Sequence, residues 1–162
     1  MSVKNRSTSS KEAYQHARRF TKARAANFYY AFSALSNEKR NAIYAAYAFA
    51  GTVDDAVDDS ANDAERNKLL TQAKNMLELA YSEQKDKIDE QEWLTRALHD
   101  AVNRFAIPKL YFQELIAGME QDITQTRFVT YAELEQYCYR AASVIGLISI
   151  EIFGYDKRHR DL

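Results

Sequence analysis

The sequence is poor in the residues that make turns and crosslinks. Its 162 residues include one proline, four glycines and one cysteine, whereas good helix formers such as Ala, Leu, Glu and Lys are abundant. So few turn formers exclude a many-stranded protein, and we predict an all-α fold. Cys138 has no partner for an internal disulfide or a zinc site, which is typical of an intracellular protein, so we expect a cytoplasmic location.

Long hydrophobic runs are also missing. The longest, at 141–150, ends at Glu151 and is far shorter than the roughly 20 residues that a transmembrane helix requires. Residues 1–10 are polar and lack the apolar segment of a secretory signal, so we expect a disordered tail there and one domain over 11–162. Contact with a membrane surface, as a peripheral protein, stays open.

Charge is balanced along the chain. The formal net charge is −1 and the two signs are mixed, so nothing in the sequence favours a nucleic-acid partner. The basic residues between Lys11 and Arg24 are interpreted as a solvated helix face.

Apolar residues recur at helical spacing through most of the domain. Ser36, Asn62 and Thr130 are predicted N-caps, the last forming a capping box with Glu133, and Gly154 is a predicted helix stop. The lone proline, at 108, suits the first turn of a helix. The expected helices lie within 11–35 and at 36–58, 62–81, 93–105, 108–122 and 131–153.

The most informative stretch is an alanine-rich run that turns into carboxylates at 54–59. On a helix, Tyr47, Gly51, Asp54 and Asp58 lie on one face, so an aromatic surface leads into an acidic patch that also holds Asp55. Such a patch is either a solvated surface or a site for a hard cation such as Mg²⁺, which commonly bridges carboxylates to phosphate oxygens.

Two further groups carry weaker signals. Asp122 ends an apolar helix face that begins at Leu115, and a carboxylate in that position is commonly just solvated. Aromatic and small residues alternate from Tyr137 to Gly146, with Ala142 between them. The small residues permit either close helix packing or an open channel for a long apolar ligand, and the sequence alone favours packing.

Taken together, these segments resemble the squalene/phytoene synthase family, the head-to-head prenyl transferases of isoprenoid and carotenoid biosynthesis. FYYAF at 28–32 is similar to the family's N-terminal aromatic segment. RNAIYAAYAF at 40–49, followed by VDDAVD at 53–58, is similar to its first aspartate motif. LIAGM at 115–119 with Asp122, then YCYR at 137–140 and Gly146, fit its central signature.

The resemblance implies an isoprenoid-synthase-type helical bundle with a central cavity for two molecules of farnesyl or geranylgeranyl diphosphate. It also implies Mg²⁺ as cofactor, with NADPH needed only if the product is squalene rather than dehydrosqualene or phytoene. By analogy, the catalytic residues are Tyr137, Asp54 and Asp58, the metal-binding residues are Asp54, Asp55, Asp58 and Asp122, and the substrate-binding residues are Phe28, Tyr47, Ala142 and Gly146.

The sequence departs from the family pattern in two places. The family has a Cys-Arg pair before its first aspartate motif, where this chain has Ala50 and Gly51, so an arginine expected to contact diphosphate is missing and Arg24 or Lys22 would have to compensate. No second aspartate-rich motif follows up to Leu162. We therefore expect a truncated chain, inactive alone, that associates with itself or with a complementing C-terminal half.

Other functions stay open. Head-to-tail prenyl diphosphate synthases and terpene cyclases also use aspartate-rich motifs with Mg²⁺, although YCY at 137–139 argues against both. The other alternative is a non-catalytic helical remnant or interaction module, which Gly51 and the missing second motif would support.

Overall fold

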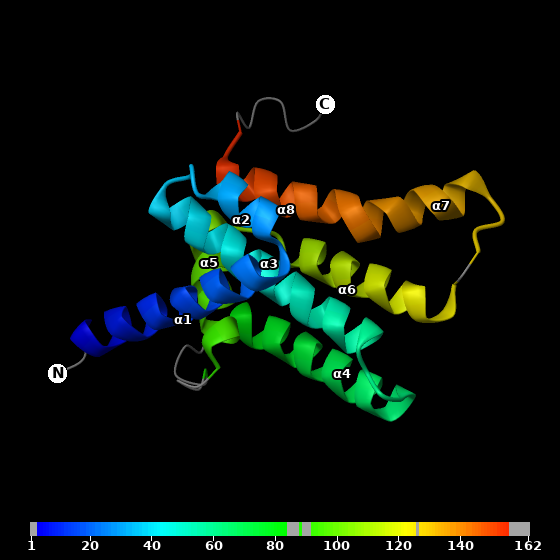
Figure 1. Ribbon diagram of the computed structural model, residues 1–162, viewed down its shortest axis with the longest axis horizontal. Helices are drawn as coiled ribbons and strands as arrows, with labels where there is room; N and C mark the ends of the chain where they lie inside the picture. The colour runs from blue at the N-terminus through cyan, green and yellow to red at the C-terminus, as the bar shows by residue number, and fades with distance from the viewer. Residues whose placement is uncertain (1–2, 84–87, 89–91, 126, 156–162) are drawn as a thin grey trace.

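The computed structural model describes residues 3–83, 88, 92–125 and 127–155, and these residues form helices with no strand among them (Figure 1). The all-α prediction is therefore confirmed. Within the same residues, no helix is both long enough and apolar enough to cross a bilayer. The helices are α1 (Val3–Arg24), α2 (Ala26–Phe32), α3 (Asn37–Asp58), α4 (Asp63–Ala80), α5 (Trp93–Phe105), α6 (Lys109–Thr124), α7 (Tyr131–Cys138), the π-helical η2 (Tyr139–Ser143) and α8 (Val144–Phe153).

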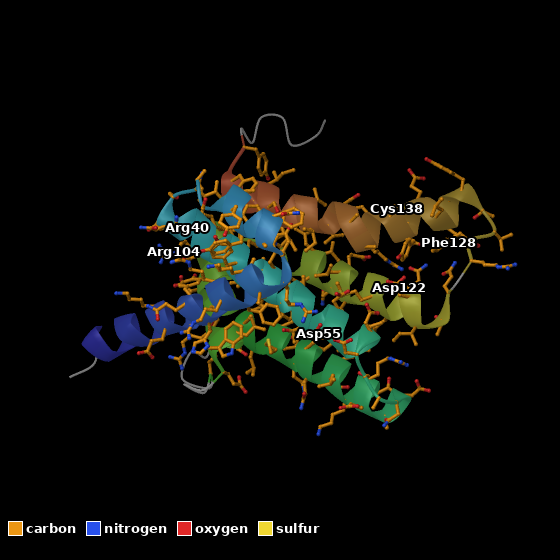
Figure 2. The ribbon with its side chains drawn as sticks, viewed as in Figure 1. Arg40, Asp55, Arg104, Asp122, Phe128 and Cys138 are labelled. Atoms are coloured by element: carbon orange, nitrogen blue, oxygen red, sulfur yellow. The ribbon has the colours of Figure 1, made fainter. Side chains whose placement is uncertain are left out.

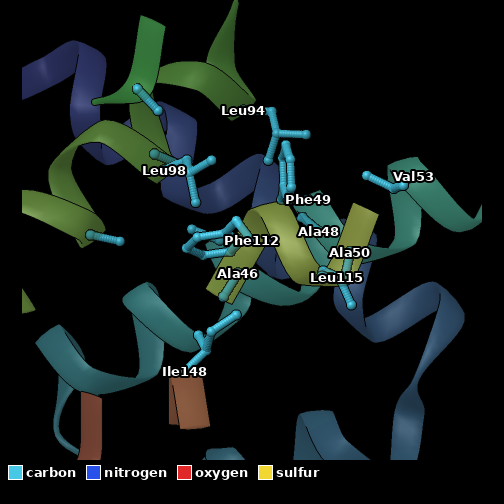
Figure 3. Packing of buried hydrophobic residues seen from close by; sticks show 14 of the residues in the cluster. Ala46, Ala48, Phe49, Ala50, Val53, Leu94, Leu98, Phe112, Leu115 and Ile148 are labelled. Carbon is cyan, nitrogen blue, oxygen red and sulfur yellow. The ribbon is translucent and has the colours of Figure 1, made fainter. Parts of the chain in front are cut away.

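Helix α3 forms the centre of the bundle. It packs against α1, α2, α4, α5, α6 and α8 (Figure 1). Most of its buried residues are alanines, and small side chains let neighbouring helices approach closely. Its Phe49 is fully buried and meets Phe112 of α6 edge to face, with ring centroids 5.4 Å apart. Leu94 and Leu98 of α5 and Ile148 of α8 complete this core (Figure 3).

Helix α1 is fixed across α3 and α5 by packing and by polar contacts. The Tyr14 hydroxyl donates a 2.6 Å hydrogen bond to Asp100 of α5. Buried Thr21 donates to the carbonyl of Tyr44 in α3 at 3.4 Å. These contacts hold the C-terminal end of α1 beside α3, and that end carries Arg24.

Most of the predicted helix ends are confirmed. The Asn62 side chain accepts from the Glu65 amide, Thr130 and Glu133 form the capping box, and Gly154 ends α8 with φ of 81°. Ser36 does occupy the N-cap position of α3, but its side chain makes no capping hydrogen bond. Pro108 is the N-cap of α6 and lies just outside the first turn in which we expected it.

The start of α1 differs from the expectation. The helix begins at Val3, so residues 3–10, expected to be a disordered tail, are helical, and residues 1–2 lie outside the described residues. Once a helix is nucleated, each added residue gains one backbone hydrogen bond, so polar residues of fair helix propensity extend it. Low hydrophobicity was therefore a poor guide to the start of this helix.

The helix expected at 131–153 is interrupted by a π-helical turn. Arg140 lies in this turn, η2, where the segment crosses α6 beside Gly118. A Cβ atom on Gly118 would lie 2.7 Å from the Arg140 Cβ and 3.0 Å from its carbonyl carbon. The Arg140 side chain donates to Glu114 of α6 at 2.7 Å. The missing side chain of Gly118 therefore allows the backbones of α6 and η2 to touch.

We predict that Gly118→Ala destabilises the fold. Its Cβ would meet backbone and Cβ atoms of η2, which cannot rotate away, so we expect a loss of about 1–3 kcal/mol in the free energy of unfolding. The matched control is Gly146→Ala on α8, where nothing lies within 4 Å of the new Cβ, and a gain of about 0.5–1 kcal/mol is expected. Urea denaturation measures both, and equal effects of the two variants would contradict the close crossing.

Candidate active site

A cavity of about 260 Å³ lies where the C-terminal end of α1 meets α3 and α6. Its lining joins apolar and aromatic side chains to charged ones: Phe20, Thr21, Arg24, Ala25, Tyr47, Ala50, Gly51, Asp54 and Met119. The structure thus confirms that Tyr47, Gly51 and Asp54 share one face of α3. An apolar pocket with a few charged groups at one end is the usual form of a small-molecule site.

Negative charge gathers around Asp54. Burial raises the pKa of this carboxyl group, and repulsion from Asp58 adds to the rise, as do Asp55 and Asp122, whereas Arg24 opposes it. Asp122 lies on α6 and acts across the gap between the helices, so the acidic group is not confined to α3. These carboxylates have excess negative charge that a cation would relieve.

Asp55 differs from its neighbours because it already has a cationic partner. Both terminal nitrogens of the Arg24 guanidinium donate to its two carboxylate oxygens, which forms a bidentate ion pair between α1 and α3. Asp55 is labelled in Figure 2. The other cation that we considered for this role, Lys22, lies over the Tyr29 ring with its Nζ 5.5 Å from the centroid. Arg24 thus brings positive charge to the carboxylates at the end of α3, where Arg66 of α4 also donates a 3.2 Å hydrogen bond to the Val57 carbonyl.

Tyr137 and Asp122 meet at the connection between α6 and α7. A hydrogen bond to Asp122 is the main cause of a raised pKa for the Tyr137 phenol, with smaller contributions from burial and from the charge of Asp122. Phe128 packs on Tyr137 with ring centroids 4.8 Å apart, and Figure 2 shows Asp122 and Phe128 close to this connection. The phenol therefore stays protonated and donates to a carboxylate of the acidic group.

An aromatic cluster lies beside the cavity. The Phe28 ring is 5.2 Å from that of Tyr47 and 5.9 Å from that of Phe32, so two of the predicted substrate-binding residues, Phe28 and Tyr47, are in contact. Phe28 is about half exposed, and it reaches the cavity only through Tyr47. Aromatic faces of this kind can stabilise a nearby positive charge.

Ala142 and Gly146 do not line this cavity. Both are exposed, on η2 and α8, and no atom lies within 4 Å of the position where a Cβ of Gly146 would be. Their predicted part in a prenyl tunnel stays a prediction. Conversely, Phe20 and Met119 line the cavity although the sequence analysis gave them no role. The spacing of Phe20 and Arg24, i to i+4 on α1, was the sequence feature that could have predicted that these two residues share a face.

The carboxylates suit Mg²⁺ in part. Within the described residues, no three or more His, Cys, Asp or Glu side chains converge as a ready metal cage. Magnesium does not require such a cage, because it commonly binds one or two carboxylates and completes its octahedron with water and substrate phosphates. Asp54 and Asp58, one turn apart on the same face of α3, offer that kind of oxygen donor set.

Comparisons with known proteins agree with this chemistry. Residues 21–162 match the family model described as squalene/phytoene synthase. The phytoene synthase of Mycobacterium tuberculosis is 35% identical over 91% of this chain and 46% of its own length. Phytoene synthase 1 of Zea mays, described as chloroplastic, is 32% identical over 89% of this chain and 34% of its own length.

Solved structures show the same arrangement of helices. A dehydrosqualene synthase solved with a ligand is 29% identical and superposes with a TM-score of 0.75, covering 88% of this chain and 48% of that one. The squalene synthase HpnC from Alicyclobacillus acidocaldarius is 25% identical with a TM-score of 0.80, covering 92% and 54%. The chain thus spans less than half of the two curated relatives and about half of these two structures, and the expected isoprenoid-synthase-type fold is confirmed.

We predict that Asp54→Asn stabilises the metal-free protein at neutral pH. The folded-state pKa of Asp54 is raised above its ordinary value of 3.8, so the folded state holds the proton more tightly than the unfolded state does. Stability therefore falls as pH rises through the window above 3.8, and the penalty is complete at neutral pH. Removing the charge removes that penalty.

Thermal denaturation in EDTA at pH 7 and at pH 3 tests this prediction. The variant should melt above the wild-type protein at pH 7, and the difference should shrink at pH 3, where both side chains are neutral. Because Asp54 is only partly buried and keeps much of its surface in water, added salt should also reduce the difference at pH 7. A variant that is less stable than the wild-type protein at pH 7 would refute the repulsion inferred for this site.

Proposed function

The chain belongs to the squalene/phytoene synthase family of head-to-head prenyl transferases, and we propose that its cavity binds a prenyl diphosphate through Mg²⁺ for that coupling reaction. One observation supports the proposal most. Asp54 of α3 lines the polar end of a cavity whose other walls are largely apolar, and Asp58 of α3 and Asp122 of α6 lie close enough to raise its pKa further. A prenyl diphosphate is divided in the same way, into a charged diphosphate and an apolar chain.

Asp54 and Asp58 would hold the metal against the diphosphate. Bound Mg²⁺ would neutralise the negative charge that develops on the departing diphosphate as the allylic C–O bond breaks. The apolar walls would take the prenyl chain, with Phe20, Tyr47 and Met119 closest to it. The rings of Tyr47 and Phe28 would stabilise the allylic cation through their faces.

Tyr137 and Asp122 would move the proton that coupling releases. The second prenyl double bond attacks the allylic cation, and closure of the cyclopropane ring requires loss of one proton from carbon. The hydrogen bond to Asp122 that raises the pKa of the Tyr137 phenol would use the phenol proton and leave the lone pairs of its oxygen available to accept. The oxygen can therefore accept the substrate proton while its own proton passes to the carboxylate.

The substrates are two molecules of farnesyl or geranylgeranyl diphosphate, and NADPH is required only if the product is squalene. The solved neighbours include a dehydrosqualene synthase and a squalene synthase, and the curated relatives include phytoene synthases, so the family covers each of these products. The chain spans about half the length of these two structures.

We predict Mg²⁺-dependent binding of a farnesyl diphosphate analogue in which sulfur replaces the oxygen between the farnesyl carbon and the first phosphorus. Isothermal titration calorimetry should show at least about tenfold weaker binding for Asp54→Ala and for Asp58→Ala, since ligands and their partners at metal sites contribute on this scale. Asp59→Ala is the matched control, because Asp59 is the exposed residue that follows α3, and its affinity should match the wild-type value.

Equal affinity with and without Mg²⁺ would refute the metal site and favour a non-catalytic helical module. Incubation with each prenyl diphosphate, with and without NADPH, identifies the product by analysis of the extracted lipids. A longer linear diphosphate, which is the product of head-to-tail condensation, would contradict the proposed coupling.

A further inference from the structure

The cavity is unevenly charged. Among the described residues that line it, Arg24 is the single cationic side chain, whereas Asp54 lines it and Asp55, Asp58 and Asp122 lie close enough to act on Asp54. A diphosphate anion entering this cavity meets one group able to donate charge-assisted hydrogen bonds to its oxygens. Guanidinium groups suit this task because their planar donors match two phosphate oxygens at once.

Gly51 provides the space in which the Phe20 ring lies beneath Arg24. A Cβ on Gly51 would be 2.8 Å from Cε1 of the Phe20 ring and 3.6 Å from the Arg24 Nε. Arg24 in turn lies over the same ring, with its guanidinium carbon 5.3 Å from the centroid. The missing side chain thus lets Phe20 pack against α3. The Phe20 ring in turn supports the Arg24 guanidinium beside residue 51, which has no charged side chain.

The partner that Arg24 now has is easily exchanged. The side chains of Arg24 and Asp55 are 39% and 31% exposed, and ion pairs this open to water contribute little to stability. A diphosphate carries more negative charge than one carboxylate and offers the same bidentate geometry. The guanidinium can therefore turn from Asp55 to phosphate while the Phe20 ring still supports it.

We propose that Arg24 is a diphosphate-binding residue, seated against Phe20 by the absence of a side chain at Gly51, which exchanges Asp55 for the substrate's phosphate oxygens on binding. The proposal rests on the function proposed above. It assigns to α1 the positive charge that the cavity-lining residues of α3 lack. It also gives the Arg24–Asp55 pair a role in the substrate-free state only.

Arg24→Gln tests the assignment with three probes, two measured by calorimetry and one by electron paramagnetic resonance. Affinity for the thio analogue of farnesyl diphosphate with Mg²⁺ should fall about tenfold or more, the usual scale for a charge-assisted bond. Affinity for farnesol, which lacks the phosphates, should not change. Binding of Mn²⁺ alone, followed by electron paramagnetic resonance, should be unchanged or tighter because a nearby positive charge is gone.

Two further variants sharpen the test. Arg24→Lys should retain part of the affinity, since it keeps the charge and loses the bidentate geometry. Gly51→Ala should weaken analogue binding by displacing the Phe20 ring, with Arg24 itself intact. Arg19→Gln is the control, because Arg19 is exposed on α1, does not line the cavity and donates a hydrogen bond to the backbone carbonyl of Gln15.

The outcomes separate this proposal from the one on which it rests. If the wild-type chain binds the analogue no better with Mg²⁺ than without it, both proposals fail. If the wild-type protein shows Mg²⁺-dependent binding and Arg24→Gln binds the analogue equally well, the assignment of Arg24 alone is overturned. A variant that binds all three probes more weakly would also overturn it, because that pattern reports a structural role.

Discussion

The structure depends on the small side chains of α3. Five helices and the short α2 surround this helix, and they come close because alanines such as Ala42, Ala45 and Ala46 occupy its buried faces. Larger residues there would separate the helices by the width of a side chain and open the core around Phe49. The close packing also fixes where the last turns of α3 lie, between the end of α1 and the face of α6. The cavity and its charges follow from that placement.

The last turns of α3 carry charges that are unfavourable for helix stability. A helix C-terminus carries a partial negative charge and favours cations, yet α3 ends with Asp54, Asp55 and Asp58 and has no basic residue in its last turn. Partial burial, and after it repulsion from the neighbouring carboxylates, raises the pKa of Asp54. Arg24, from another helix, offsets part of the charge at Asp55. Such local conflicts in an otherwise consistent fold are expected at functional sites, where a ligand supplies what the chain omits.

Local patterns predicted much of this molecule. Helical spacing placed Tyr47, Gly51 and Asp54 on one face, and the Thr130 capping box needed only neighbouring residues. Features that join distant segments were not predictable in this way. Nothing in the spacing of 131–153 indicates the π-helical turn, which lies where this segment crosses Gly118 on another helix. The contact of Tyr137 with Asp122 likewise depends on the path of the α6–α7 connection, which helical spacing does not show. The role proposed for these residues came from the resemblance to a family and not from periodicity.

The charge balance of the cavity sets how metal and substrate depend on each other. With one arginine against several carboxylates, the metal-free site repels a diphosphate, so on the proposed function the anion binds weakly until a divalent cation reverses the local field. Linkage then requires the reverse: the diphosphate must raise the affinity for the cation by the same factor. On the proposed function, Asp54 and Asp58 alone would make an incomplete coordination shell, which substrate oxygens would complete. An arginine at position 51 would weaken this mutual dependence by adding positive charge permanently. An arginine that is paired with Asp55 would preserve this mutual dependence, because the carboxylate offsets its charge until phosphate replaces the carboxylate.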